Sequence, residues 1–342
     1  MRVRGLLRVL VFSILPFFAL GARPAETARP ALEGTIEQLL ELDVRPFAIG
    51  HRGFGANLGE DPSRPIEDTV PAVRKGFMAG VSVVEVDVQL TSDGEVAVFH
   101  DDFLSDFTCL NHLTLSELQA RLPFVPGLQA VLNQAREFNQ SSGPLRGLVI
   151  VELKAAAPLC DPDDTQDEAI VSAVVRIIRQ MEMTNQVMFT SLSPALLFLA
   201  ANEAPEITRD LEISGLQFLT AEQVQALLGL PVTLIHKDLD LGLQWAEVGP
   251  TFRLPGYRSI SEVLSTAAVV GARVIEADLI FFSLLSFDDA VSFVGATHLS
   301  GLKVLGYTAN NAPEWFFLQS LDLDGIYTND IPFGVEHQAP IP

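Results

Sequence analysis

The sequence predicts an α/β fold, namely a TIM-type (β/α)8 barrel in a single domain, from three observations. Short apolar, β-branched runs alternate with helical patterns along most of the 342 residues, which is typical of a parallel sheet covered by helices. About eight such units recur, as expected for barrels of about 250 residues or more. No glycine-rich dinucleotide fingerprint follows the first expected strand, so a closed barrel is favoured over an open sheet. Length alone also allows two compact domains.

The barrel pattern begins with a short apolar run, residues 47–50, which we expect as a buried first strand. A loop rich in glycine and proline follows. Thr69 then begins a helix that ends at Gly80, because threonine is favoured just before a helix and glycine just after it. A shorter helix is expected earlier, over residues 35–42.

A hairpin-like insertion is expected after the second strand. Residues 81–90 are β-branched and strand-like, and the turn sequence Ser92-Asp93-Gly94 follows them. Residues 96–99 form another strand-like run, with no helical pattern between the two. Consecutive strands joined by a short turn pair as an antiparallel hairpin.

The remaining sequence continues the alternation of helices and strands. Further helices are expected over residues 116–122, 127–138, 167–181, 194–202, 220–228, 259–270, 287–298 and 312–320. Further strands are expected over residues 148–153, 186–190, 207–213, 232–236, 273–277, 303–307 and 325–328. Residues 239–257 have no clear pattern, and we expect a long loop or an insertion there.

The N-terminus has the pattern of a secretory signal peptide. Arginines precede an apolar run over residues 9–20, and small residues follow, so cleavage is expected near Gly21 or Ala22. An uncleaved anchor helix is the alternative, although the run is short for a membrane span. The signal peptide predicts a secreted or periplasmic protein. The expected divisions are a signal peptide at 1–22, a leader at 23–45, the barrel domain at 46–335 and a tail at 336–342.

The composition is strongly acidic, with 43 Asp and Glu against 22 Lys and Arg and a net charge of −21. This charge disfavours nucleic acid or an anionic membrane surface as the main partner. No later apolar run is long enough to span a membrane, so no stable membrane insertion is expected after signal cleavage. The sequence does not specify an oligomeric state.

Two cysteines, Cys109 and Cys160, lie beyond the signal peptide. In an oxidising compartment such a pair can form a disulfide. A disulfide here would join two loops that we assign to the site. Two free, partly buried thiols are the alternative.

Three carboxylates suggest a cation site. Glu85 and Asp87 are two residues apart in an expected strand, so their side chains leave the same face. Glu152 interrupts an equally apolar run at 148–153. Buried carboxylates require a cation or a basic partner, and an all-oxygen set favours Ca²⁺ or Mg²⁺ over zinc. A surface strand with outward-facing acids is the alternative.

Two histidines and two cations stand near these carboxylates in the expected fold. His51 and His100 each end an apolar run, where a lone histidine is usually structural. Two imidazoles beside a carboxylate cluster suit acid–base catalysis, while Arg52 and Lys154 suit phosphate binding. Together these residue types favour phosphodiester cleavage. His112, His236 and His298 lack such neighbours and are expected to be structural or on the surface.

The sequence resembles the glycerophosphodiester phosphodiesterases, a barrel family related to phosphatidylinositol-specific phospholipases C. The resemblance extends from residue 47 to residue 332. The pieces that carry it are His51-Arg52-Gly53, Glu67-Asp68-Thr69, Glu85-Val86-Asp87-Val88-Gln89-Leu90-Thr91, Asp93-Gly94, His100-Asp101, Glu152-Leu153-Lys154, Tyr307-Thr308-Ala309-Asn310 and Asp324-Gly325-Ile326-Tyr327-Thr328-Asn329-Asp330.

The resemblance implies hydrolysis of glycerophosphodiesters to glycerol phosphate and an alcohol such as choline or ethanolamine. It implies that the glycerol hydroxyl beside the phosphate attacks first and that water then opens the cyclic phosphate. The implied roles are acid–base catalysis by His51 and His100, binding of one divalent cation by Glu85, Asp87 and Glu152, phosphate contacts by Arg52 and Lys154, and support by Glu67 and Tyr307.

Three departures from the family pattern concern positions near the substrate. Asp68 stands where the family usually has Asn, Tyr307 where it has Trp, and Asp106-Phe107 where Arg-Thr is common. These departures leave two points open, namely which head group the substrate carries and whether the substrate must contain glycerol. One alternative is therefore an enzyme of the sphingomyelinase D or phospholipase type acting on intact lipids, for which residues 281–285 offer an apolar rim or simply core. A catalytically silent phosphate-ligand binding protein is the other alternative.

Overall fold

The computed structural model describes residues 32–341 except residues 33, 43, 142–144 and 236–242. The predicted signal peptide and most of the leader lie outside the described residues. The described residues form one compact unit, and no described helix combines the length and the apolar character needed to cross a membrane.

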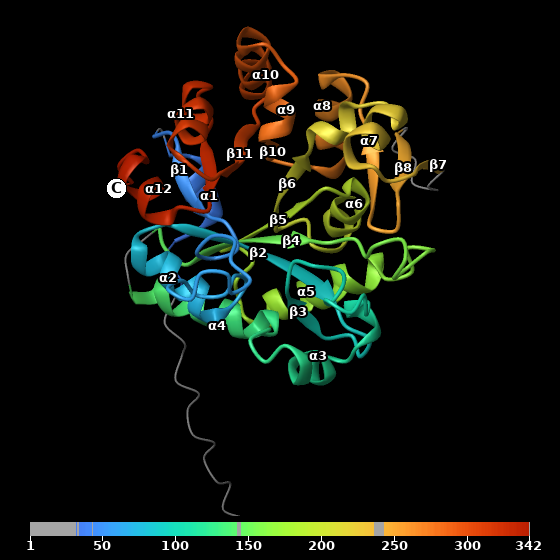
Figure 1. Cartoon of the computed structure of the whole chain (residues 1–342). Helices are drawn as coiled ribbons and strands as arrows, with labels where there is room; N and C mark the ends of the chain where they lie inside the picture. Colours follow the sequence, from blue (N-terminus) through green and yellow to red (C-terminus); the bar gives the residue numbers. More distant parts are fainter. Residues whose placement is uncertain (1–31, 33, 43, 142–144, 236–242, 342) are drawn as a thin grey trace, which may run out of the picture. The chain divides into compact units, whose positions relative to one another are not determined.

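Within the described residues, eight parallel strands close into a barrel with helices around it, which confirms the predicted fold class (Figure 1). The closure is made by β1, which pairs with β12 on one side and with β2 on the other. In order around the barrel the strands are β1 (Phe47–Gly50), β2 (Val83–Leu90), β4 (Leu148–Leu153), β5 (Val187–Ser191), β6 (Thr208–Ile213), β10 (Val274–Asp278), β11 (Lys303–Ala309) and β12 (Gly325–Thr328).

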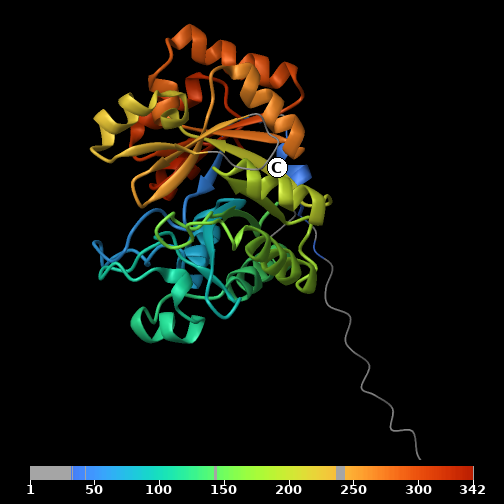
Figure 2. The ribbon, with the colours of Figure 1, turned by 90° about the vertical axis from the view of Figure 1, so that its right-hand side faces the viewer.

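Apart from α1, the helices pack around the outside of the strands, and Figure 2 shows this arrangement from a second side. Most begin and end within a few residues of the predicted positions. The helices are α1 (Ile36–Leu40), α2 (Val70–Ala79), α3 (Leu115–Arg121), α4 (Leu128–Ser141), α5 (Asp167–Gln180), α6 (Pro194–Glu203), α7 (Ala221–Leu228), α8 (Ile260–Val270), α9 (Leu279–Ser283), α10 (Phe287–Leu299), α11 (Ala312–Ser320) and α12 (Ile331–His337), with short 3-10 turns η1 (Leu110–His112) and η2 (Gly215–Phe218).

Side chains along β2 point alternately to the two sides of the strand, so that the outer face is apolar and the inner face carries the polar residues. Val84, Val86 and Val88 belong to the large core between the barrel and its helices, whereas Val83 belongs to a smaller cluster inside the barrel. Successive side chains of a strand point to opposite sides, so Glu85 and Asp87 point into the barrel. Buried residues of α1 join the inner cluster and contribute to the core inside the barrel.

The predicted hairpin after the second strand is present. Strand β3 (Val96–Val98) pairs antiparallel with the end of β2, with Val88 opposite Val98 and Leu90 opposite Val96. Helix α2 has the predicted caps as well. The Thr69 side chain accepts a hydrogen bond from the Ala72 amide, and Gly80 adopts a φ of 118°, which glycine tolerates without steric cost.

The strand predicted at residues 232–236 needs correction, because its described part lies outside the barrel. Strand β7 (Val232–Ile235) is not a barrel strand; it pairs with β8 (Gln244–Val248), and β8 pairs with β9 (Phe252–Gly256), in a separate antiparallel sheet. The described part of 239–257 is therefore an insertion with strands, not a long loop. Side chains of β7 are exposed or half-buried, unlike the buried side chains of a barrel strand. His236 lies outside the described residues.

Candidate active site

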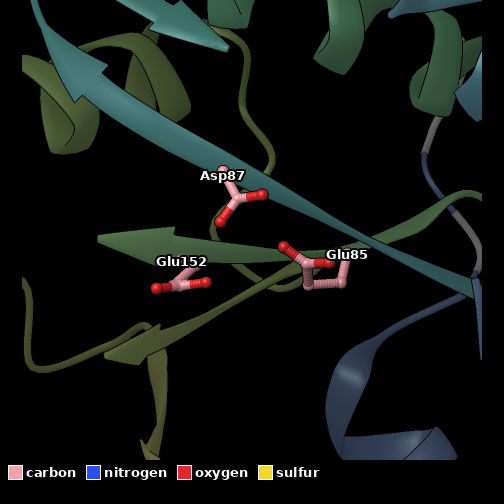
Figure 3. Close-up of side chains that lie close together, drawn as sticks. All are labelled: Glu85, Asp87 and Glu152. Atoms are coloured by element: carbon pink, nitrogen blue, oxygen red, sulfur yellow. The ribbon is translucent and has the colours of Figure 1, made fainter. Parts of the chain in front are cut away.

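Three carboxylates converge inside the barrel (Figure 3). Strands β2 and β4 are parallel neighbours with Asp87 beside Glu152, and Glu85 lies one inward position earlier on β2. One oxygen atom of each residue lies within 4.8 Å of the others. Burial and the other two carboxylates raise the pKa of Glu85 well above its usual value. This concentration of negative charge favours the binding of a cation.

The oxygen atoms available in this cluster fit a hard divalent cation. Glu85 Oε1 is buried without a hydrogen-bond partner, and Asp87 Oδ2 also lacks a hydrogen bond, with Arg52 Nε 3.4 Å away. Buried carboxylate oxygens are normally hydrogen-bonded or bound to a metal. Their oxygen chemistry suits Ca²⁺ or Mg²⁺ better than zinc. Glu85, Asp87 and Glu152 are thus the residues that could hold the ion.

Lys154 partly neutralises the cluster. Its ammonium donates to Asp87 Oδ1 at 3.1 Å and to Glu152 Oε1 at 3.0 Å. Burial alone would lower the pKa of Lys154, but Asp87 and Glu152 raise it well above its usual value. Conversely, burial would raise the pKa of Asp87, but Lys154, with His100 and Arg52, holds it well below its usual range. Asp87 and Lys154 are therefore both charged.

Arg52 connects the loop after β1 to the carboxylates. Its backbone amide donates to Glu85 Oε2 at 2.9 Å, and its guanidinium donates to Glu67 Oε1 at 2.6 Å. Glu67 also accepts from the Asn57 amide at 2.6 Å. The φ of Arg52 is 49°, an uncommon backbone conformation for a residue with a side chain. Glu67 thus holds both the loop and the guanidinium in place.

His51 is positioned by a residue at the other end of the chain. Its Nδ1 lies 2.7 Å from Asn329 Oδ1, which also accepts from the Ala56 amide at 2.7 Å. An amide oxygen accepts, so Nδ1 carries the proton and Nε2 has a free lone pair. Burial, followed by the charge of Arg52, lowers the pKa of His51 to about 4. The imidazole is therefore neutral near pH 7 and able to accept a proton at Nε2.

His100 has a different partner. Its Nδ1 lies 2.7 Å from Asp101 Oδ1, and this hydrogen bond lowers the pKa of Asp101. His100 contributes to the electrostatic environment of both His51 and Asp87. The two imidazoles therefore act on the same region but have different hydrogen-bond partners.

The other predicted residues are more peripheral. The hydroxyl of Tyr307, on β11, donates to the Ile213 carbonyl at 3.2 Å. Phe281 and Phe282, considered as an apolar rim, are buried in the core. His298 contacts Asp324 at 2.8 Å, and His112 Nε2 lies 3.3 Å from the Cys160 carbonyl. These two histidines are structural, as predicted.

Sequence reasoning assigned no role to Asn329 or Asp68. Asp68 Oδ1 accepts from the Asp87 amide at 3.2 Å, and its φ is 56°. Burial, with Asp87 and Glu85, raises the pKa of Asp68 well above its usual value. Asn329 was present in the last motif but had no assigned function. Knowledge that β1 pairs with β12 would have identified Asn329, because His51 directly follows β1 and Asn329 directly follows β12.

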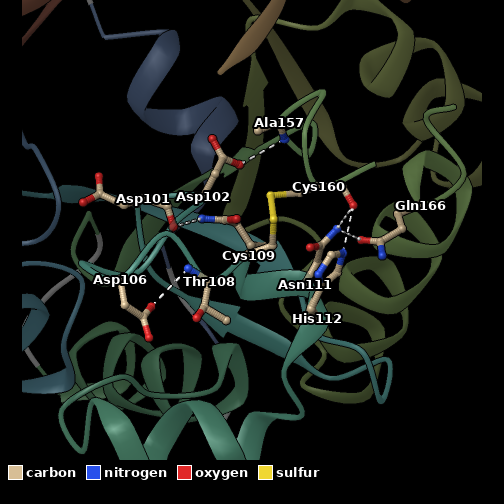
Figure 4. Close-up of a disulfide and its surroundings, with 11 residues drawn as sticks. Asp101, Asp102, Asp106, Thr108, Cys109, Asn111, His112, Ala157, Cys160 and Gln166 are labelled. Carbon is tan, nitrogen blue, oxygen red and sulfur yellow. Dashed lines mark hydrogen bonds between the residues drawn. A yellow bond between two sulfur atoms is a disulfide. The ribbon is translucent and has the colours of Figure 1, made fainter. Parts of the chain in front are cut away.

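Cys109 and Cys160 form a disulfide (Figure 4). The bond joins the segment after β3 to the segment after β4. Asp102 also accepts from the Ala157 amide at 3.3 Å across the same two segments. Both segments border the site, so the disulfide fixes one side of it.

Comparison with known proteins identifies the family. The model of the "Glycerophosphoryl diester phosphodiesterase family" matches residues 51–228, just over half of the chain. A glycerophosphocholine phosphodiesterase of Eremothecium gossypii is 33% identical over 109 residues, 31% of this chain and 7% of that protein. The uncharacterized protein YqiK of Bacillus subtilis is 26% identical over 178 residues, 47% of this chain and 64% of that protein. The matches thus span less than two thirds of either relative.

Solved structures share the fold at lower identity. A Thermotoga maritima glycerophosphodiester phosphodiesterase is 19% identical with a TM-score of 0.56, covering 85% of this chain and 98% of that one. An Oleispira antarctica phosphodiesterase, solved with the product sn-glycerol-3-phosphate, is 18% identical with a TM-score of 0.57, covering 85% and 96%. Together with the match over residues 51–228, the barrel places the chain: it belongs to the glycerophosphoryl diester phosphodiesterase family.

Proposed function

We propose that the chain is an exported, metal-dependent phosphodiesterase that hydrolyses glycerophosphodiesters to glycerol phosphate and an alcohol. The observation that carries the proposal is the cluster of Glu85, Asp87 and Glu152, with His51 and His100 acting on the same region. The family supports the substrate class, as do a relative named as a glycerophosphocholine phosphodiesterase and a solved neighbour containing sn-glycerol-3-phosphate.

The three carboxylates would hold one divalent cation, Ca²⁺ or Mg²⁺. When bound, such an ion polarises a phosphoryl oxygen and offsets the charge that develops on the phosphate. Arg52 and Lys154 add fixed positive charge for the remaining phosphate oxygens. Lys154 has three N–H donors and uses two on carboxylates, so one is left for the substrate.

The two histidines divide the proton transfers. His51 accepts the proton of the attacking hydroxyl or water at Nε2, because Asn329 fixes the proton of the ring on Nδ1. His100 donates a proton to the leaving alcohol oxygen, and the hydrogen bond between its Nδ1 and Asp101 orients the ring for this role. When the glycerol hydroxyl attacks, His51 takes up one proton and His100 releases one. The water that then opens the cyclic phosphate gives a proton to His100, and His51 returns its proton to the glycerol oxygen, so both rings regain their starting states.

Export to the cell exterior or the periplasm is part of the proposal. The predicted signal peptide supports it, and so does the disulfide, because structural disulfides persist in oxidising compartments. Mass measurement of the chain recovered from the periplasm or medium tests this. A mature protein beginning near residue 22 is expected, whereas a full-length chain retained in the cytoplasm contradicts export.

The activity is tested by measuring turnover of glycerophosphocholine with Ca²⁺, with Mg²⁺ and with a chelator. We expect glycerol phosphate and choline in the presence of one of the ions and none with the chelator. His51→Ala and His100→Ala should each abolish turnover without unfolding the protein, while His337→Ala, at the C-terminal end of helix α12, serves as the matched control. Near-normal rates in either site variant would refute the assigned pair. Binding without turnover by the wild-type chain would instead favour a silent binding protein.

A further inference from the structure

Gln89 occupies the inward position on β2 that follows the two carboxylates of this strand. Glu85, Asp87 and Gln89 are each two residues apart, so their side chains leave the same face of the strand. The Gln89 side chain is buried, and no step of the proposed function uses it. Buried polar groups are normally hydrogen-bonded, so the partners of this amide indicate its role.

The amide nitrogen of Gln89 binds three consecutive backbone carbonyls. It lies 2.9 Å from the Phe99 oxygen, 3.1 Å from the His100 oxygen and 3.0 Å from the Asp101 oxygen. An amide nitrogen carries two N–H groups, so the three carbonyls share these two donors. One side chain of β2 therefore holds the backbone of His100 and of the residues on both sides of it.

This segment needs a side-chain donor because it has left the sheet. The antiparallel ladder between β2 and β3 ends at Val98. The Phe99 amide still donates to the Asp87 carbonyl at 3.0 Å, but the Asp87 amide donates to Asp68 Oδ1 at 3.2 Å and not to the Phe99 carbonyl. Gln89 thus supplies the hydrogen bonds that the ladder does not supply here.

The hydrogen bond of the His100 side chain does not connect it to the carboxylate cluster. His100 Nδ1 lies 2.7 Å from Asp101 Oδ1. Because the two residues are neighbours in one segment, this bond orients the ring relative to the segment. Gln89 links the segment to β2, the strand that carries Glu85 and Asp87. Movement of the imidazole away from these carboxylates is therefore restrained by the Gln89 amide.

We propose that Gln89 is a positioning residue, which holds the backbone at His100 so that the imidazole reaches the leaving alcohol oxygen. The inference rests on the proposed function, in which His100 donates the proton to that oxygen. Gln89 does not touch the substrate and acts only through His100. Its loss should therefore harm protonation of the leaving group more than any other part of the reaction.

The test compares two substrates that differ in their leaving group. Choline requires a proton to leave, whereas the p-nitrophenyl ester of glycerol phosphate releases a phenolate that is stable without one. Gln89→Met removes the donors and keeps a side chain of similar length. It should lower kcat/KM for glycerophosphocholine by about tenfold or more, and for the nitrophenyl ester by less than about threefold, because only the first substrate depends on the general acid. An equal loss on both substrates, or no loss on either, would overturn the inference.

Gln186→Met is the matched control. Gln186 is also buried, and its Nε2 donates to the Gly34 carbonyl at 2.8 Å, but it directly precedes β5, at the end of the barrel opposite the site. This variant should leave the ratio of the two kcat/KM values unchanged. An equal shift of the ratio in Gln89→Met and Gln186→Met would overturn the inference. Should Gln89→Met fail to fold, Gln89→Asn carries the same test, because its shorter side chain keeps an amide that reaches the carbonyls less well.

NMR of the histidine rings separates this inference from the proposed function. With the signals assigned through His100→Ala, Gln89→Met should shift and broaden the His100 ring signals and leave those of His337 unchanged. Unaltered His100 signals in Gln89→Met would overturn the inference. The expected change in the His100 signals, together with a wild type that hydrolyses neither substrate, would refute the proposed function and still support the placement of His100 by Gln89.

Discussion

The Lys154 ammonium lies 3.1 Å from Asp87 Oδ1 and 3.0 Å from Glu152 Oε1, which places it between two of the three carboxylates. A buried carboxylate that loses its cation is strongly destabilising. Lys154 therefore contributes to stability as well as to the proposed phosphate site. A bound divalent cation and Lys154 offset the same negative charge.

Replacing this lysine should make stability depend on metal. In chelator, Lys154→Met should lower the free energy of unfolding by about 3 kcal/mol, since breaking a buried ion pair leaves an uncompensated charge. Excess Ca²⁺ or Mg²⁺ should recover part of this loss, because ions that bind only the folded state stabilise it. Urea unfolding with and without the ion measures both effects.

The matched control is Lys75→Met, which removes an exposed lysine of α2 that lies over the Phe54 ring. It should change stability little in either condition. If Lys154→Met is no less stable than Lys75→Met, the ammonium does not balance the carboxylates.

The pH profile should reveal the environment of His51. Because burial and Arg52 lower its pKa to about 4, the ring stays unprotonated, and active as a base, well below pH 6. With the cation saturating, so that its three carboxylates stay ionised, protonation of His51 should reduce kcat/KM only as pH decreases through about 4, because kcat/KM reports groups of the free enzyme. Asn329→Asp places a negative charge on the His51 Nδ1–H and should move this fall to higher pH. A wild-type profile that falls near pH 6.5 would contradict the assigned environment.

The barrel could be predicted because each of its strands and helices produces a recognisable pattern within a short stretch of the sequence. Alternation along residues 83–90 identified the inward carboxylates, and the short turn at 92–94 identified the hairpin. Sheet membership is not local, however. A strand-like pattern at 232–235 predicts a strand but not its partner, and β7 in fact pairs with β8 outside the barrel.

Contacts between distant residues explain what the sequence analysis missed. Gly50 pairs with Thr328, so the residues that follow them, His51 and Asn329, become neighbours only when the barrel closes. The apolar run at 281–285 posed a similar difficulty. Hydrophobicity did not distinguish a rim from core, and the buried positions of Phe281 and Phe282 follow from packing against other helices and aromatic rings.

Loss of the disulfide should weaken the stability of the fold. The bond closes a loop with a sequence separation of 51, for which restriction of the unfolded chain stabilises by up to about 4 kcal/mol. The Cys109→Ser/Cys160→Ser variant should unfold at lower urea concentration than the wild type. Reductant should reproduce this loss of stability in the wild type and leave the variant unchanged; a wild type unaffected by full reduction would contradict the role of the bond.

The buried acid Asp210 should destabilise the folded barrel as pH rises. Asp210, on β6, is fully buried, and burial raises its pKa well above the usual value of 3.8. Below about pH 4 the residue is protonated in both the folded and the unfolded states, so Asp210→Asn should have little effect on stability. At higher pH the unfolded chain ionises while the folded chain must retain the proton, so the wild type loses stability until pH reaches the folded pKa.

Asp210→Asn removes this titration and should therefore be more stable than the wild type by about 1–3 kcal/mol near pH 8. Urea unfolding at several pH values measures the difference, with Asp163→Asn, in an exposed loop, as the control for the same change of charge. The gain should grow with pH only for Asp210→Asn. A constant difference across the range, or a loss that grows with pH, would mean that Asp210 is ionised in the folded barrel and is compensated there by a partner.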